Sequence, residues 1–178
     1  MIVKSKSLDT VLPKFAHKVR PENVLIKNLK CTDSSKGQYQ SELIVDQSHS
    51  FLYDYPFAVD HVPGLVIIEA AKQMSCVVAH EYWDIPMEYA FAPLKASSKF
   101  IRFVELEPAP LLIGTLSYKS VMKGICLADM VTEVFQESNK MGALKSKFVF
   151  IVPEIYKKIR SGMTNSKMSR MIELIRQL

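Results

Sequence analysis

The strongest constraint on the fold is one long helix that is apolar on nearly every face. The pattern predicts this helix over residues 63–83, and the Asp84-Ile85-Pro86 sequence ends it, because proline cannot continue helical hydrogen bonding. A helix that is hydrophobic all round must be covered by other elements on most sides. The rest of the chain therefore has to wrap around it.

Segments rich in β-branched and aromatic residues lie on both sides of this helix in the sequence and predict strands. Two precede the helix, and the small polar residues 33–37 join them as a hairpin. Four follow it as an antiparallel run, with hairpin turns at Lys123-Gly124 and across residues 138–142. The six predicted strands are 23–32, 38–46, 89–104, 111–122, 125–137 and 143–152.

Two strands, a buried helix and four more strands is the element order of an α+β fold in which a strongly curved antiparallel sheet is wrapped around a central helix. This arrangement is the hotdog fold. At 178 residues, without an internal repeat or a linker, the chain fits a single domain. We expect a hotdog domain over residues 1–153 and a C-terminal helical tail over 154–178, with Met168, Met171 and Ile175 at helical spacing.

The cysteine content indicates the cellular compartment of the protein, and its charge indicates which kinds of partner it binds. The three cysteines show no metal-binding spacing, and an odd number fits a disulfide framework poorly, so a reducing cytoplasm is expected. No signal-peptide pattern begins the chain, and Glu69, Lys72 and Gln73 interrupt its longest apolar run, so no membrane span is expected. A net charge of +5 favours acidic partners, but the basic residues are scattered, which argues against nucleic acid. No metal or cofactor is predicted.

The start of the helix combines two features of a binding site. Pro63 suits the first helical turn, where its missing N–H costs nothing, and Gly64 allows another group to approach the exposed backbone amides. Amides at a helix start bind anions and polarised carbonyl oxygens. Within the first two turns, Glu69 places a lone carboxylate in apolar surroundings. A carboxylate there needs either a hydrogen-bonding or charged partner or a chemical role.

These residues fit acyl transfer, which requires an oxyanion cradle, a base and a dry site for the acyl chain. The N–H groups of Gly64 and Leu65 would polarise a thioester carbonyl, assisted by the helix dipole. Burial would raise the pKa of Glu69, which would accept the proton of a hydroxyl group or of water. His61 would share this role or hold the substrate, and Asp60 would orient His61 or cap the helix.

Structural roles compete with these chemical ones. Glu69 is also explained as a buried acid whose hydrogen-bonding partner is Gln73, a loop amide or a facing subunit. Gln73 either orients Glu69 or packs in the core. His80 has a cysteine four residues before it, a ligand-like spacing that is better explained as a helix-end residue beside a core thiol. His17 is expected at the surface, with a phosphate contact beside Lys18 as its alternative.

The motif around the helix start resembles the signature of the A-factor biosynthesis hotdog family. The resemblance extends upstream and covers residues 10–153. Its segments are Asp60-His61-Val62-Pro63-Gly64 with Glu69-Ala70-Ala71-Lys72-Gln73, the opening stretches Pro13-Lys14-Phe15-Ala16-His17-Lys18 and Glu22-Asn23-Val24-Leu25-Ile26, and the approach His49-Ser50-Phe51 with Tyr55-Pro56.

This resemblance implies that the substrates are acyl thioesters. A-factor synthases transfer a β-ketoacyl group from acyl carrier protein to the hydroxyl of dihydroxyacetone phosphate, which starts the synthesis of γ-butyrolactone signals in secondary metabolism. They resemble two hotdog halves in tandem, whereas this chain has the length of one, so a homodimer or pairing with another hotdog subunit would restore the pair. Related dehydratases carry a catalytic histidine where Tyr55 stands here, which argues against dehydration by their acid and histidine pair.

Three functions remain open. The first is an acyltransferase that takes a β-ketoacyl group from acyl carrier protein or CoA to a small hydroxyl acceptor. The second is a thioesterase or dehydratase on the same scaffold, and the third is a noncatalytic acyl-binding or assembly subunit. The predicted catalytic residues are Glu69, His61 and Gly64, and the predicted substrate-binding residues are Tyr55, Asp60, Pro63, Leu65 and Gln73.

Overall fold

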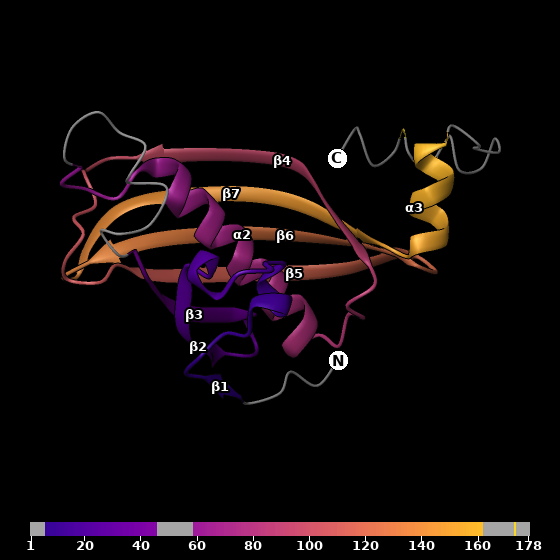
Figure 1. Ribbon diagram of the computed structural model, residues 1–178, viewed down its shortest axis with the longest axis horizontal. Helices are drawn as coiled ribbons and strands as arrows, with labels where there is room; N and C mark the ends of the chain where they lie inside the picture. The colour runs from indigo at the N-terminus through magenta and orange to yellow at the C-terminus, as the bar shows by residue number, and fades with distance from the viewer. Residues whose placement is uncertain (1–5, 46–58, 162–172, 174–178) are drawn as a thin grey trace.

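Figure 1 presents the computed structural model, which describes residues 6–45, 59–161 and 173. Within these residues, seven antiparallel strands form one sheet in the order β1-β2-β3-β5-β6-β7-β4, and the sheet curves around helix α2 (Gly64–Glu81). The predicted α+β hotdog arrangement is confirmed. The strands are β1 (Ser7–Leu8), β2 (Ile26–Asp33), β3 (Gln38–Leu43), β4 (Ala90–Phe100), β5 (Leu111–Met122), β6 (Ile125–Gln136) and β7 (Asn139–Ile151).

The position of the strand that follows α2 determines which strand lies at one edge of the sheet. Strands β5, β6 and β7 form the predicted meander, and β3 pairs with β5. Helix α2, the next described element after β3, crosses in front of the meander in Figure 1, and β4 follows it on the far side of β7. Strand β4 is therefore an edge strand, and its residues from Pro93 to Phe100 are all exposed.

The β6–β7 hairpin turns earlier than the sequence predicts. Its turn consists of Glu137 and Ser138, whose φ angles of 48° and 68° are both positive, and Gln136 pairs with Asn139. The prediction placed the turn over 138–142 because asparagine and glycine favour positive φ. Gly142 instead lies within β7, where a Cβ atom would come 2.8 Å from the carbonyl oxygen of Lys99 in β4. Close packing of the two strands, and not a turn, requires glycine there.

The segment before β2 is also more structured than predicted. Two short 3-10 helices, η1 (Pro13–Ala16) and η2 (Pro21–Asn23), precede β2, which begins at Ile26 and not at residue 23. In both, a proline occupies the start and removes an N–H that would have had no partner. Both lie over α2 in the centre of the molecule (Figure 1). Residues in or next to these 3-10 helices contact the candidate site.

Helix α2 forms the centre of the core. Its buried residues include Val66, Ile67, Met74 and Val77, which pack with the inner face of the sheet. The helix is not covered on every side, since Leu65 in its first turn is 77% exposed. None of the helices in the described ranges is long and apolar enough to cross a membrane.

Helix α3 (Pro153–Arg160) follows β7 and lies at the end of the sheet away from β1 (Figure 1). Its residues Ile155, Tyr156 and Ile159 pack against a second, smaller core from β6 and β7, made of Ile125, Leu127, Val149 and Ile151. The methionines predicted to form the helical stripe of the tail lie outside the described residues.

Candidate active site

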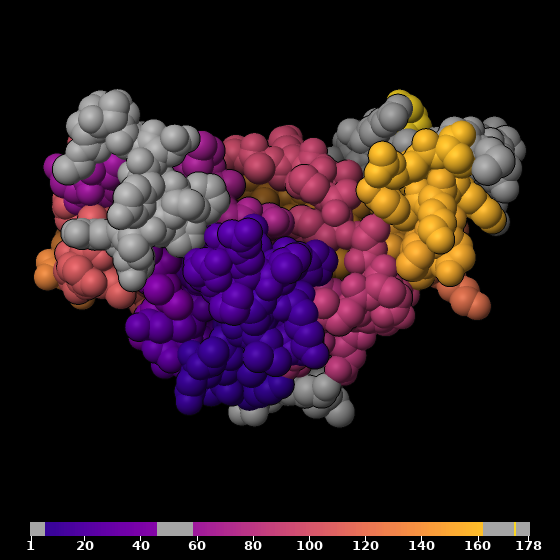
Figure 2. Space-filling view, viewed as in Figure 1, coloured from indigo at the N-terminus to yellow at the C-terminus, as the bar shows by residue number. Residues whose placement is uncertain are grey.

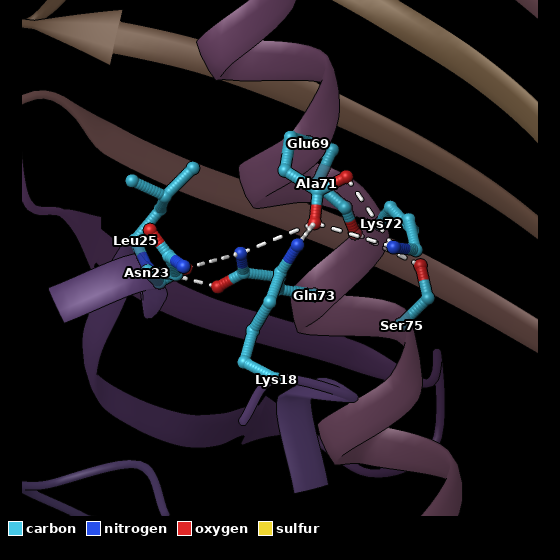
Figure 3. Close-up of polar contacts among 8 residues, drawn as sticks. All are labelled: Lys18, Asn23, Leu25, Glu69, Ala71, Lys72, Gln73 and Ser75. Carbon is cyan, nitrogen blue, oxygen red and sulfur yellow. Dashed lines mark hydrogen bonds and ion pairs between the residues drawn. The ribbon is translucent and has the colours of Figure 1, made fainter. Parts of the chain in front are cut away.

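Three nitrogen donors converge on Glu69, on the face of α2 that the N-terminal segment covers (Figure 3). The ammonium of Lys18, which follows η1, lies 2.7 Å from Oε1. The ammonium of Lys72, one turn along α2, lies 3.2 Å from Oε1 and 3.3 Å from Oε2. The side-chain amide of Gln73 donates to Oε1 over 3.2 Å. The carboxylate is thus held by its own helix and by a distant segment.

Gln73 connects this carboxylate to the chain just before β2. Its Nε2 also donates to the carbonyl oxygen of Asn23 over 2.9 Å, and its Oε1 accepts the N–H of Leu25 over 2.8 Å. The side chain is fully buried, and its bond to Leu25 satisfies a buried backbone N–H. Of the two alternatives for Gln73, contact with Glu69 and packing in the core, the structure shows both. Its substrate-binding role stays a prediction.

The pKa of Glu69 is lowered, which corrects the prediction of a raised value. Burial raises the pKa as expected, but the hydrogen bond from Lys18, the charge of Lys72 and the hydrogen bond from Gln73 together outweigh burial. The prediction failed because the position of Lys18 beside the helix was not visible in the local sequence. Glu69 is therefore an ionised carboxylate at neutral pH, able to accept a proton.

Asp60 and His61 form a separate pair ahead of the helix. Nδ1 of His61 lies 2.8 Å from Oδ1 of Asp60, and this contact lowers the pKa of Asp60. His61 also forms an isolated β-bridge with Glu105, and its ring packs edge-on against Phe103. Among the described residues, neither member of the pair is hydrogen-bonded to Glu69.

Of the two roles predicted for Asp60, orientation of His61 is observed and helix capping is not. The N-cap of α2 is Pro63, and no side chain caps it. Pro63 itself is buried. Tyr55, the remaining predicted contact in this region, lies outside the described residues.

In the first turn of α2, two amides have no hydrogen-bond partner among the described residues. The N–H groups of Val66 and Ile67 bond to the carbonyl oxygen of Pro63, so the predicted cradle consists of the preceding N–H groups of Gly64 and Leu65. The ring of Phe100 at the end of β4 lies over Gly64, where an added Cβ would meet it at 3.0 Å. The close approach that glycine permits is thus made by this ring.

An apolar groove of about 270 Å³ lies between α2, β4 and β7. Lys72 lines this groove and also contacts Glu69. The N-terminal segment, indigo in Figure 2, covers the front of the helix next to it. The apolar lining consists of Ile68, Ala71, Phe91, Pro93, Ala96, Leu144 and Phe148, and the polar lining residues include Lys95 and Lys145.

Sequence reasoning missed Lys18 as a partner of Glu69. It named Lys18 only as a neighbour of the phosphate contact considered for His17. Lys72, in contrast, could have been found from its i, i+3 spacing to Glu69 on the helix. The pairing of Lys18 leaves no local pattern, because the two residues come from different elements.

Comparisons with known proteins agree with this fold. Residues 4–151 match the family model of the A-factor biosynthesis hotdog domain. Two enzymes named 2-oxo-3-(phosphooxy)propyl 3-oxoalkanoate synthase align in part. The one from Streptomyces virginiae is 38% identical over 37% of this chain and 19% of its own length, and the one from Streptomyces coelicolor is 32% identical over 52% and 24%. The chain thus matches about a fifth to a quarter of these relatives.

A solved structure supports the fold independently. The crystal structure of a thioesterase from Haemophilus influenzae superposes with a TM-score of 0.55 at 12% identity, and the match covers 85% of this chain and 96% of the other.

Proposed function

Because the chain belongs to the A-factor biosynthesis hotdog family, we propose that it takes an acyl group from an acyl carrier protein or CoA thioester and transfers it to a small hydroxyl acceptor. The observation that carries this proposal is the position of Lys72. Its side chain lines the apolar groove and also contacts the ionised Glu69, so Lys72 links a site for an acyl chain to a proton acceptor.

In this mechanism the groove takes the acyl chain. The N–H groups of Gly64 and Leu65 hold the thioester carbonyl oxygen, and each such donor stabilises the transition state by about 3 kcal/mol. The acceptor oxygen attacks the carbonyl carbon while Glu69 receives the hydroxyl proton. The carbon–sulfur bond then breaks, the thiolate leaves, and the proton passes from Glu69 to the thiolate. No other reactant is needed.

We also infer that a second hotdog subunit, in the simplest case another copy of this chain, pairs along β4. The outward N–H and C=O groups of an edge strand are available for another strand, and β4 is exposed from Pro93 to Phe100. Residues of this strand, including Lys95 and Ser98, line the apolar groove. A subunit paired along β4 would therefore cover the open side of the groove.

The deciding experiment is mass spectrometry of the products from a panel of acyl carrier protein and CoA thioesters, with and without dihydroxyacetone phosphate. An ester formed only with the acceptor supports acyl transfer. Free acid without the acceptor would indicate a thioesterase, an enoyl product a dehydratase, and binding without turnover an acyl-binding subunit. A Glu69→Gln variant that kept full transfer activity would refute the role of Glu69.

A further inference from the structure

A pair of histidines joins the N-terminal segment to α2 away from the Glu69 contacts. Nε2 of His17 lies 2.8 Å from Nε2 of His80, and the two rings are stacked with centroids 5.0 Å apart. Phe91 packs edge-on against His17, and Phe150 packs edge-on against His80. His80 is only 7% exposed, so this contact is part of the core.

The hydrogen-bond partners define the proton positions in this pair. Nδ1 of His80 lies 2.7 Å from the carbonyl oxygen of Ile85, which can only accept, so Nδ1 of His80 carries the proton. In a neutral imidazole the other nitrogen then accepts, and His17 must donate through its Nε2. Burial is the main cause that lowers the pKa of both rings, which favours this neutral pair. The nearby charges are those of Lys72, Glu81 and Glu88.

The backbone at His17 directs the next residue toward Glu69. His17 has φ 54° and ψ 44°, the left-handed conformation, and closes η1 by donating its N–H to the carbonyl oxygen of Lys14. The N–H of Lys18 bonds to the carbonyl oxygen of Pro13 over 2.8 Å. Left-handed backbone is costly for a residue other than glycine and persists only where its surroundings fix it. Here the bond to His80 is such a constraint.

We propose that His17 is a positioning residue, which uses its hydrogen bond to His80 to hold Lys18 in contact with the Glu69 carboxylate. Consecutive residues of one short turn thus contact α2 at two points, His17 at His80 and Lys18 at Glu69. The importance of this contact for catalysis rests on the proposed function, but the contact itself does not.

The proposal is tested by following the ionisation of Glu69 directly. Carbon-13 NMR of the full chain labelled at glutamate carboxyls gives the pKa of Glu69, with the resonance assigned from its loss in Glu69→Gln. We expect Lys18→Met to raise this pKa because it removes an opposite charge. His17→Ala should produce at least half of that rise, because Lys18 is then no longer held in place.

Three variants separate positioning from packing. His17→Gln keeps an N–H donor for His80 and should restore the pKa of Glu69 toward the wild-type value. His17→Phe keeps the ring but removes the donor, so it should raise the pKa as His17→Ala does, and it replaces that variant if the latter does not fold. Lys14→Ala, an exposed change in η1, serves as the matched control and should leave the pKa unchanged.

An unchanged Glu69 pKa in a folded His17→Ala or His17→Phe protein overturns the proposal. The measurement requires no turnover, so it is separate from a failure of the proposed function. If the wild-type protein shows no transferase activity but the pKa of Glu69 responds as expected, the positioning role of His17 is supported and the proposal of acyl transfer is refuted. If transferase activity is present but the pKa of Glu69 does not respond, acyl transfer is supported and the positioning role of His17 is refuted.

Discussion

The ammonium of Lys18 lies 2.7 Å from Oε1 of Glu69, and this contact makes the central helix and the N-terminal segment parts of one site. Both side chains are largely shielded, with 22% and 21% of their surfaces exposed. Burial favours the neutral form of this carboxyl group and raises its pKa, whereas the hydrogen bond from Lys18 lowers the pKa, as do Lys72 and Gln73. The lowered pKa leaves Glu69 ionised and able to accept a proton.

The lowered pKa of Glu69 predicts that its contribution to stability depends on pH. The ordinary value is 4.5, and the folded protein has a lower one, so the unfolded chain binds the proton first as the pH falls. The contribution is therefore complete above about pH 4.5 and is lost as the pH falls through the pKa of the folded state. Urea unfolding should show Glu69→Gln less stable than wild type by about 1 kcal/mol at pH 7, with a difference that shrinks toward pH 3.

Glu22→Gln is the control for this titration, because Glu22 is exposed in η2. It should follow the wild-type stability at every pH. A stability difference for Glu69→Gln that did not change with pH would contradict an ionised Glu69 in the folded protein.

Replacing Gln73 tests the link between α2 and the chain before β2. Gln73→Leu removes both the acceptor for the N–H of Leu25 and the donor to the carbonyl oxygen of Asn23. Leaving buried backbone groups without a partner should cost about 1–3 kcal/mol in the free energy of unfolding. The measurement is the urea midpoint, with Gln40→Leu on β3 as the control. Equal midpoints for the two variants would show that the Gln73 bonds contribute no more than surface contacts.

The apolar groove should set acyl-chain length. Ile68→Trp places a large ring into the groove wall, so long-chain thioesters lose buried contacts while short ones still fit. We expect the affinity for long-chain acyl-CoA to fall about tenfold in calorimetric titration, which corresponds to the burial of about two methylene groups. Val131→Trp, on the opposite face of the sheet, is the matched change and should leave affinity unaltered. A uniform loss for all chain lengths would argue against the groove as the acyl site.

Pairing through β4 predicts a change of mass when this edge is charged. Ala96 is exposed on β4, and Ala96→Lys would bring like charges close together across a two-fold strand pair. Light scattering after gel filtration should give the mass of two chains for wild type and of one chain for this variant. Ser120→Lys on β5 adds the same charge elsewhere and should remain a dimer. A wild-type protein with the mass of a single chain would refute self-pairing along β4.

The sequence-based predictions were wrong where contacts between distant segments outweighed the local preference of a residue. Gly142 was assigned to a turn because glycine favours turns, yet β4 packs so closely on β7 that the strand itself needs glycine. Residue 23 was assigned to a strand, whereas Pro21–Asn23 forms a 3-10 helix. The direction of the Glu69 pKa was wrong because the prediction considered burial alone, whereas Lys18, Lys72 and Gln73 all lower this pKa.

The sequence by itself determined the central helix, the strand meander, the family motif and the choice of Glu69 as the candidate acid, because periodicity and spacing act over a few neighbouring residues. The tertiary structure alone decided which groups surround Glu69 and that His17 meets His80. The whole of β2 and β3 lies in the sequence between the N-terminal segment and α2, so no local pattern encodes these contacts. They depend on how two short 3-10 helices pack over the helix once the sheet has folded around it.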